Sequence, residues 1–286
     1  MTLEDEFGDI IGKARAGLGY STEALSRMAG VPAHDLSDLE KYRRAPSQEE
    51  VVSLANALNL DAAKLAEIAR GAWHPKSEPW ENDASVVVRG IAVPIGGYSE
   101  NSYTVGCRAT GRAIVFDPGG SAEAIAAAVR EAGLNVEAIA ITHGHSDHTG
   151  GIASLARMLG ISSVIGHPDD LNAVTGLTKT SVVDNDDFKL GDLTVRVLHT
   201  PGHTKGSVCY HLGRVCLVGD TLFAGSLGRA NAGEGAYRLL LDSVMNKILS
   251  LPADTALLTG HGPATTVAEE LRHNPFFGDN ESSGSL

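Results

Sequence analysis

The sequence is poor in the features that mark exported, membrane-spanning or nucleic-acid-coating proteins. No apolar run approaches the roughly 18 residues that a membrane span needs, and the acidic first ten residues offer neither a basic nor an apolar signal region. Basic residues are scarce, since 23 Lys and Arg stand against 35 Asp and Glu, for a formal net charge of −12. This balance argues against a main partner that is nucleic acid or anionic lipid. We therefore expect a cytoplasmic protein without a membrane partner.

Cysteine is also rare, with three in 286 residues. A chain of this length with 43% hydrophobic residues can bury a full core without disulfide staples. Cys209 and Cys216 lie in apolar, strand-like runs. We expect Cys107, Cys209 and Cys216 to be reduced and mostly buried thiols.

Residues 1–70 have the pattern of a small all-helical domain. Apolar residues recur there at spacings of three and four, which predicts five short helices. Ser47 to Glu50 matches a capping box, and Asp61 can cap the next helix. The following segment, 71–84, has two prolines and no periodicity, and it contains Trp73 and Trp80. It is typical of a linker, which the two tryptophans could pin to a surface.

Residues 85–278 follow a different pattern, in which β-type runs alternate with helices. The predicted strands are 85–93, 101–106, 113–117, 138–142, 163–166, 193–199, 207–211, 215–219 and 256–259, and the predicted helices are 121–132, 152–159 and 237–249. This order predicts two mixed sheets covered by helices, an αββα sandwich of the α/β class. Residues 279–286 are expected to be a disordered tail.

Four predicted strands end in side chains that commonly bind metals. The residues concerned are His143, His145, Asp147, His148, His203, Asp220 and His261. A single histidine at the end of a strand is more often a structural hydrogen-bonding group than a metal ligand. His199 could have such a structural role, or it could support the metal ligands. Three imidazoles and a carboxylate within six residues are, however, costly to bury without a cation. The pattern H-x-H-x-D-H, followed by H, D and H, therefore predicts a site for zinc, iron or manganese.

These motifs resemble a known signature. THGHSDH, TPGHT, GDTLF and TGHGP, in this order, are similar to the five-motif signature of the metallo-β-lactamase superfamily. GDTLF followed by Gly228-Arg229, GHGPATT, and His273-Asn274-Pro275-Phe276 resemble the glyoxalase II (hydroxyacylglutathione hydrolase) branch. The resemblance covers about residues 85 to 278 and implies the αββα metallo-β-lactamase fold.

The resemblance also implies how the ligands divide between two divalent metal ions, for which zinc is favoured and iron or manganese are alternatives. One metal would be held by His143, His145 and His203, the other by Asp147, His148 and His261, with Asp220 bridging them. A metal-bridging hydroxide would attack the substrate. Asp147 could orient this hydroxide, and Asp220 would fix the separation of the metals. Position 145 is histidine, where flavodiiron oxygen reductases of the superfamily would have glutamate. Position 220 is aspartate, where the best-known β-lactamase subclass would have cysteine. Both differences favour a hydrolytic site with two metals.

The substrate is less well defined by the sequence. By resemblance, Arg229 would bind a carboxylate of a glutathione thioester, although an exposed loop arginine is an equal alternative. From the resemblance, we expect this chain to lack the C-terminal helical extension that completes the thiol site in larger glyoxalases. A thioester or a related ester is the favoured substrate. The alternative is a persulfide dioxygenase that holds one iron through His143, His203 and Asp220.

Residues 11–69 resemble a Cro/repressor-type helix-turn-helix domain, on the segments ARAGLGYS, LSRMAGV and RRAPS. In such domains a helix from about residue 32 to 40 would lie in the DNA major groove. Here that helix carries Asp35 and Asp38, and residues 1–70 have a net charge of −4. Lys41, Arg43 and Arg44 could still contact phosphates. Two interpretations of residues 11–69 therefore remain. This segment could bind DNA in a regulator whose other domain senses a ligand, or it could serve in dimerisation or docking. We expect a homodimer.

Overall fold

The computed structural model describes residues 2–76 and 78–278, so the predicted tail, 279–286, lies outside the described residues. The chain begins with the five expected helices, which we call the helical domain: α1 Phe7–Gly17, α2 Thr22–Ala29, α3 Ala33–Glu40, α4 Gln48–Leu58 and α5 Ala62–Ala69. Their ends follow the predicted caps. Ser47 and Glu50 form the capping box of α4, and Asp61 accepts hydrogen bonds from the backbone of Ala63 and Lys64 at the start of α5.

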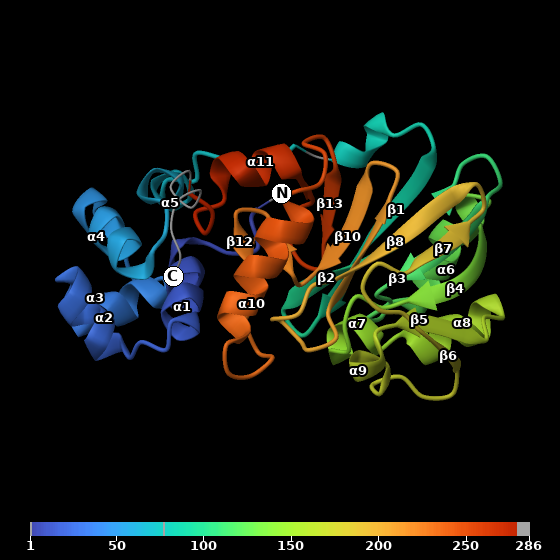
Figure 1. Cartoon of the computed structure of the whole chain (residues 1–286), viewed down its shortest axis with the longest axis horizontal. Helices are drawn as coiled ribbons and strands as arrows, with labels where there is room; N and C mark the ends of the chain where they lie inside the picture. The colour runs from blue at the N-terminus through green and yellow to red at the C-terminus, as the bar shows by residue number, and fades with distance from the viewer. Residues whose placement is uncertain (1, 77, 279–286) are drawn as a thin grey trace.

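The rest of the described chain forms a sandwich of two six-stranded sheets, with strand orders β1-β2-β3-β4-β5-β6 and β14-β13-β10-β9-β8-β7 (Figure 1). The first sheet contains β1 Val86–Ile95, β2 Tyr98–Cys107, β3 Arg112–Phe116, β4 Asn135–Ala140, β5 Ser163–Gly166 and β6 Thr178–Ser181. The second contains β7 Asp187–Leu190, β8 Leu193–His199, β9 Val208–Leu212, β10 Val215–Gly219, β13 Ala256–Thr259 and β14 Thr265–Thr266. A short hairpin, β11 Leu222–Phe223 and β12 Ser226–Leu227, follows β10.

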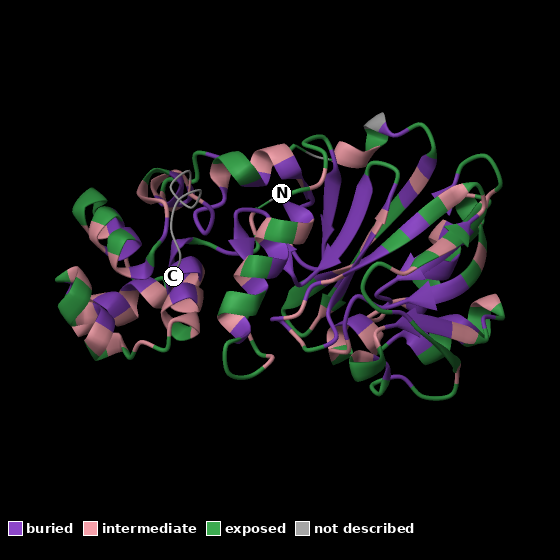
Figure 2. Cartoon of the chain, viewed as in Figure 1, coloured by how far each residue is buried: buried purple, intermediate pink, exposed green. Residues whose placement is uncertain are grey.

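Helices cover both outer faces of the sandwich, so the predicted αββα architecture is confirmed. They are α6 Ala122–Glu131, α7 Ser146–Thr149, α8 Ile152–Leu159, α9 Pro168–Leu171, α10 Ala236–Ser243 and α11 Val267–His273. Successive side chains of β3 point to opposite faces of its sheet and so belong to two different hydrophobic clusters. In β3, Ile114 and Phe116 face the second sheet, whereas Val115 packs against α6 and α8. The inner strands β3, β10 and β13 are buried almost throughout, whereas the edge strand β6 is exposed (Figure 2).

The third core cluster joins the helical domain to the sandwich. It runs from Leu25 and Leu54 of the helical domain to Leu240 of α10 and Leu257 of β13. Figure 1 shows α10 and α11 between the helical domain and the sheets. The two parts therefore share one continuous apolar core.

The structure departs from the predicted elements where the sequence is polar or irregular. The strand expected at 138–142 lies at Asn135–Ala140, and the helix expected at 237–249 continues after Ser243 as a π-helix, Val244–Ile248. Ser121 precedes α6, but its side chain makes no capping hydrogen bond. The strands β6 and β7 were not predicted, because they are polar edge strands without an apolar face of their own.

The segment between the helical domain and β1 is anchored by both tryptophans. Trp73 is buried and stacks on His273 of α11 with ring centroids 4.7 Å apart. Trp80 lies in a short 3₁₀-helix, Pro79–Asn82, and meets Tyr103 edge to face at 6.4 Å. Cys107, Cys209 and Cys216 are free and buried, as expected. Among the described residues, no helix is long and apolar enough to cross a membrane.

Candidate metal centre

The predicted ligand residues meet at one edge of the two sheets. His143 and His145 lie in the loop between β4 and α7, Asp147 and His148 lie in α7 itself, and His203 follows β8. Asp220 comes directly after β10, and His261 lies two residues after β13. The strands β10 and β13 are parallel neighbours, so their carboxyl ends bring Asp220 and His261 together. The fold therefore converts four distant chain segments into one cluster.

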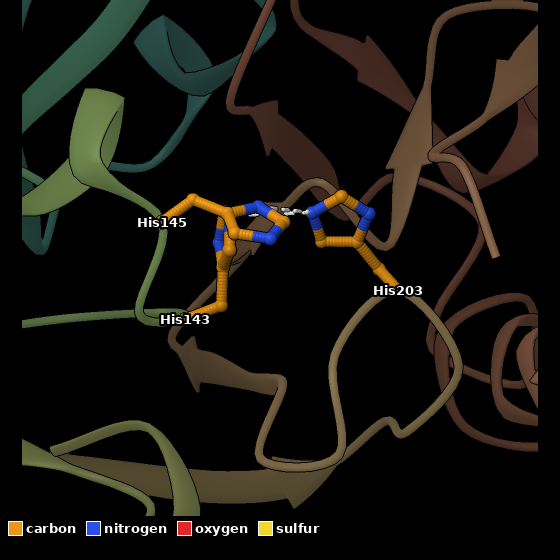
Figure 3. A group of neighbouring side chains, drawn as sticks. All are labelled: His143, His145 and His203. Atoms are coloured by element: carbon orange, nitrogen blue, oxygen red, sulfur yellow. Dashed lines mark hydrogen bonds between the residues drawn. The ribbon is translucent and has the colours of Figure 1, made fainter. Parts of the chain in front are cut away.

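His143, His145 and His203 converge on a single point (Figure 3). The Nδ1 atom of His145 lies 3.0 Å from Nε2 of His143 and 2.9 Å from Nε2 of His203, and the two Nε2 atoms are 3.3 Å apart. Nitrogens that coordinate one tetrahedral cation at about 2.05 Å are separated by about 3.3 Å. The three imidazoles are thus spaced as a cation requires.

A second group lies beside the first, and Asp220 faces both. The atoms of Asp147, His148 and His261 come close enough to hold one ion. The Oδ2 atom of Asp220 lies 3.5 Å from Nε2 of His203 and 3.6 Å from Nε2 of His261, while its Oδ1 lies 3.3 Å from Nε2 of His148. This carboxylate is positioned between the two groups, which is the arrangement expected of a bridging ligand.

Two buried atoms of the cluster lack a hydrogen-bond partner within the described chain. They are Nε2 of His148 and Oδ1 of Asp220, which lie 3.3 Å from each other but are not oriented to form a hydrogen bond. Buried polar atoms are rarely left unpaired, because the lost hydration is costly. Since these atoms point into the centre and belong to ligand-type groups, the residues present fit a bound metal.

The outward ring nitrogens are held by neighbouring groups. Nδ1 of His203 binds the backbone oxygen of Arg229 at 2.8 Å, and Nδ1 of His261 binds the backbone oxygen of Ser99 at 2.7 Å. Nδ1 of His148 lies 3.1 Å from Oδ2 of Asp117. Such partners fix the tautomer and the orientation of metal-binding histidines, which leaves Nε2 free to face the centre.

Charge in the cluster is strongly coupled. Burial disfavours a charged His148, but Asp220 and Asp117 outweigh it and raise the pKa of the imidazole well above its usual value. Burial and the neighbouring His148 lower the pKa of His143 well below its usual value. The hydrogen bond with His261 lowers the pKa of Asp147 to about 2. The centre therefore offers ionised carboxylates beside a neutral imidazole of His143.

Three residues near the centre were missed by the sequence analysis. Asp117 accepts hydrogen bonds from the backbone nitrogen and the hydroxyl of Thr142, at 2.7 and 2.6 Å, besides its contact with His148. Glu100 is fully buried 3.9 Å from His148, and burial raises its pKa to about 10. The hydroxyl of Tyr98 donates to Asp147 at 3.3 Å. The only available signal was the position of Asp117 at the end of β3, on the same sheet edge as the motif.

Two residues weighed in the sequence lie outside the cluster. His199 stacks on His167 with ring centroids 4.5 Å apart, and its Nε2 contacts the backbone oxygen of Lys205 at 2.9 Å. The structure thus gives His199 a hydrogen-bonding role at the end of its strand. The side chain of Arg229 is exposed, and its backbone oxygen accepts a hydrogen bond from His203.

Two separate segments of the chain match known protein families. The sequence profile described as the metallo-beta-lactamase superfamily matches residues 95–261, and the profile described as helix-turn-helix matches residues 11–65. The hydroxyacylglutathione hydrolase GloC of Haemophilus influenzae is 30% identical over 203 residues, which span 64% of this chain and 95% of the relative.

Solved structures give the same result. ETHE1 from Myxococcus xanthus superposes with a TM-score of 0.59 at 29% identity, covering 66% of this chain and 83% of that one. The di-iron-bound form of TTHA1623 gives a TM-score of 0.55 at 32% identity, covering 65% of this chain and all of that one. The chain thus resembles these proteins over about two thirds of its length, and the helix-turn-helix match accounts for a separate segment at its N-terminal end.

Proposed function

The chain belongs to the metallo-beta-lactamase superfamily, and on that premise we propose that it is a dinuclear metal-dependent hydrolase of thioesters or related esters. The observation that carries this proposal is the position of Asp220, whose carboxylate faces His203 on one side and His148 and His261 on the other. Two divalent cations bound here would lower the pKa of a shared water towards about 7 and stabilise the oxyanion of the substrate.

The residues of the chain have distinct roles in this proposal. One ion would be held by His143, His145 and His203, the other by Asp147, His148 and His261, and Asp220 would contact both. Asp147 would also orient the attacking water, and the hydroxyl of Tyr98 donates a hydrogen bond to its carboxylate. Zinc is favoured by the imidazole-rich ligand set, and iron is the main alternative, in line with the di-iron form of TTHA1623.

The alternative persulfide dioxygenase would use one iron with His143, His203 and Asp220. His145 argues against it, because its Nδ1 is as close to the two other imidazoles as they are to each other. A two-histidine, one-carboxylate site would have no use for this third nitrogen.

The test is metal analysis of protein purified without chelator, combined with hydrolysis of S-lactoylglutathione. We expect two metals per chain in the wild type, and fewer metals with an activity loss of about 100-fold or more in His145→Ala. His34→Ala is the matched control, because the side chain of His34 is 79% exposed in the helical domain. One iron per chain, with oxygen uptake on glutathione persulfide, would contradict the proposal.

DNA stays a second partner to test, through the helix-turn-helix match. The structure pairs much of the positive charge of the helical domain internally. Arg15 binds Glu40 through two hydrogen bonds of 2.6 and 2.8 Å, and Arg44 pairs with Glu50 and lies 3.5 Å from Asp35. Paired arginines are less available to phosphates. Salt-dependent binding of duplex DNA by the full chain would support a DNA-binding regulator. Cytoplasmic location and a homodimer also stay predictions.

A further inference from the structure

Helix α1 of the helical domain is fastened to the loop that follows β12. The ammonium group of Lys13 donates to the backbone oxygen of Leu227 at 2.7 Å and to the carboxylate of Asp5, and it lies 4.7 Å from the ring centroid of Phe223. The side chains of Lys13 and Asp5 are each only 7% exposed. A buried ion pair that also binds a backbone oxygen fixes the position of that backbone.

The same loop rests directly on the metal centre. A β-carbon at Gly228 would overlap the backbone oxygen of Asp220 and would lie 3.3 Å from Nδ1 of His203. The next residue, Arg229, accepts the hydrogen bond from that Nδ1 at 2.8 Å. The helical domain is therefore linked to the ligand-type residues through only two or three intervening residues.

Two adjoining cavities lie along this loop. The first, about 100 Å³, is lined by Lys13, Ala16 and Gly17 of α1, by Leu227 to Asn231, and by Tyr237 and Phe276. The second, about 320 Å³, is lined by residues around the metal centre: His145, Asp169, Asp170, His203, Thr204, Lys205, Asn231 and Ala232. Asn231 lines both cavities. The first therefore borders α1, and the second borders the metal centre.

Arg229 supplies an available positive charge at the first cavity. Its side chain is exposed, and within residues 2–76 and 78–278 its guanidinium makes no hydrogen bond or ion pair. Burial raises the pKa of Asp9 on α1, and the charge of Arg229 acts against this larger effect and lowers the pKa of that carboxyl. Lys13, by contrast, is already engaged with Asp5 and Leu227. A free guanidinium suits a carboxylate, which it can bind through two parallel hydrogen bonds.

We propose that helix α1 forms one wall of the substrate site. The first cavity takes one carboxylate end of the thiol half of the substrate, Arg229 binds this carboxylate, and Ala16 and Gly17 of α1 contribute to the wall of the cavity. The acyl half then lies in the second cavity, beside His145 and His203. This inference rests on the proposed thioester hydrolysis. It gives the helical domain a part in substrate recognition, independent of any binding to DNA.

The test compares two tryptophan substitutions at exposed alanines of the helical domain. Ala16→Trp fills the first cavity, whereas Ala63→Trp on α5 is the matched control, because Ala63 is exposed and lines neither cavity. Binding of S-methylglutathione, an inert thioether, is measured by calorimetry on the metal-loaded full chain. Hydrolysis is measured with S-lactoylglutathione and with p-nitrophenyl acetate, which has no carboxylate.

We expect Ala16→Trp to weaken S-methylglutathione binding and to raise the KM for S-lactoylglutathione about tenfold or more. Its kcat/KM for S-lactoylglutathione, divided by its kcat/KM for p-nitrophenyl acetate, should fall by a similar factor. Ala63→Trp should match the wild type. Arg229→Ala should show the same selective loss, and the smaller change Ala16→Leu keeps the inference about α1 testable if Ala16→Trp misfolds.

The outcomes separate this inference from the proposed function. If Ala16→Trp folds and binds like the wild type, α1 is not a wall of the site, even where hydrolysis is confirmed. If the wild type does not bind S-methylglutathione, the inference is overturned whatever the protein hydrolyses. A third outcome is that the wild type binds S-methylglutathione, that Ala16→Trp and Arg229→Ala both weaken this binding, and that no thioester is hydrolysed. In that case the inference holds and the proposed function fails.

Discussion

The aromatic ring of Tyr237 lies against the α-carbon of Gly17, so closely that a β-carbon at residue 17 would overlap the ring. Gly17 ends α1 of the helical domain, and Tyr237 lies in the first turn of α10 on the sandwich. The two domains thus meet at a position where a side chain on α1 is excluded.

This contact predicts opposite effects for two glycines of the same helix. Gly17→Ala should lower the free energy of unfolding by about 1–3 kcal/mol, because the new methyl group displaces the ring of Tyr237. Gly12→Ala should raise it by about 0.5–1 kcal/mol, since the nearest atoms to its β-carbon lie 3.9 Å away and alanine favours the helix. Urea denaturation of both variants checks the prediction. Equal effects at the two positions would show that the domains do not pack as described.

Substitution of Asp117 should lower the affinity for metal, although Asp117 is not one of the seven proposed ligands. Asp117→Asn replaces one of the two oxygens that serve Thr142 and His148, so one of these groups loses its acceptor. The backbone should adapt, because asparagine tolerates the left-handed conformation of this residue, with φ of 48°. We expect metal affinity to fall about 10- to 100-fold, measured by competition with a chromogenic chelator.

The control for this substitution is Asp184→Asn, which removes a carboxylate that pairs with Lys247 at 2.7 Å. This variant should keep wild-type metal affinity. If Asp117→Asn also kept it, Asp117 would have no role in holding His148 for a metal.

Removal of metal should destabilise the chain. The cluster places buried carboxylates and imidazoles together, with Nε2 of His148 and Oδ1 of Asp220 unpaired within the described residues. A ligand that binds only the folded state at 100 times its Kd contributes about 2.7 kcal/mol of stability. We expect EDTA to lower the Tm by several degrees, and added zinc to restore it. A Tm that stays constant through both steps would argue against metal binding at this cluster.

The buried carboxyl group of Glu270, outside the metal centre, should make the free energy of unfolding depend on pH. It is fully buried and accepts hydrogen bonds from Gly225, from Thr265 at 2.8 Å and from Asn274 at 2.8 Å. Burial raises its pKa from 4.5 to about 7, against the opposing effect of these hydrogen bonds. The folded state therefore holds the proton more tightly than the unfolded state. This stabilisation is complete below pH 4.5 and is lost as the pH rises through about 7.

Glu270→Gln should remove this pH dependence, because glutamine stays neutral. The difference in unfolding free energy between variant and wild type should shift in favour of the variant by up to roughly 3 kcal/mol between pH 5 and pH 8.5. Urea denaturation across this range measures it. Glu131→Gln, at an exposed position of α6, serves as the control and should show no such trend. A constant difference for Glu270→Gln would contradict the raised pKa.

The sequence by itself determined the fold class and the membership of the seven-residue cluster. His143, His145, Asp147 and His148 are close in the chain, and the remaining three follow apolar strands, so local patterns were sufficient to find them. The helices of the helical domain were likewise predictable, because their caps and their apolar spacing are local properties.

Only the tertiary structure decided which residues support that cluster and how the two domains meet. Asp117 reaches His148 because β3 and β4 are parallel neighbours, and Gly17 meets Tyr237 across more than 200 residues of chain. The polar strands β6 and β7 form because partners in each sheet satisfy their backbone groups. These contacts depend on packing between segments far apart in the sequence, and side-chain packing and backbone pairing across such distances leave no periodic or local signal that the sequence alone could show.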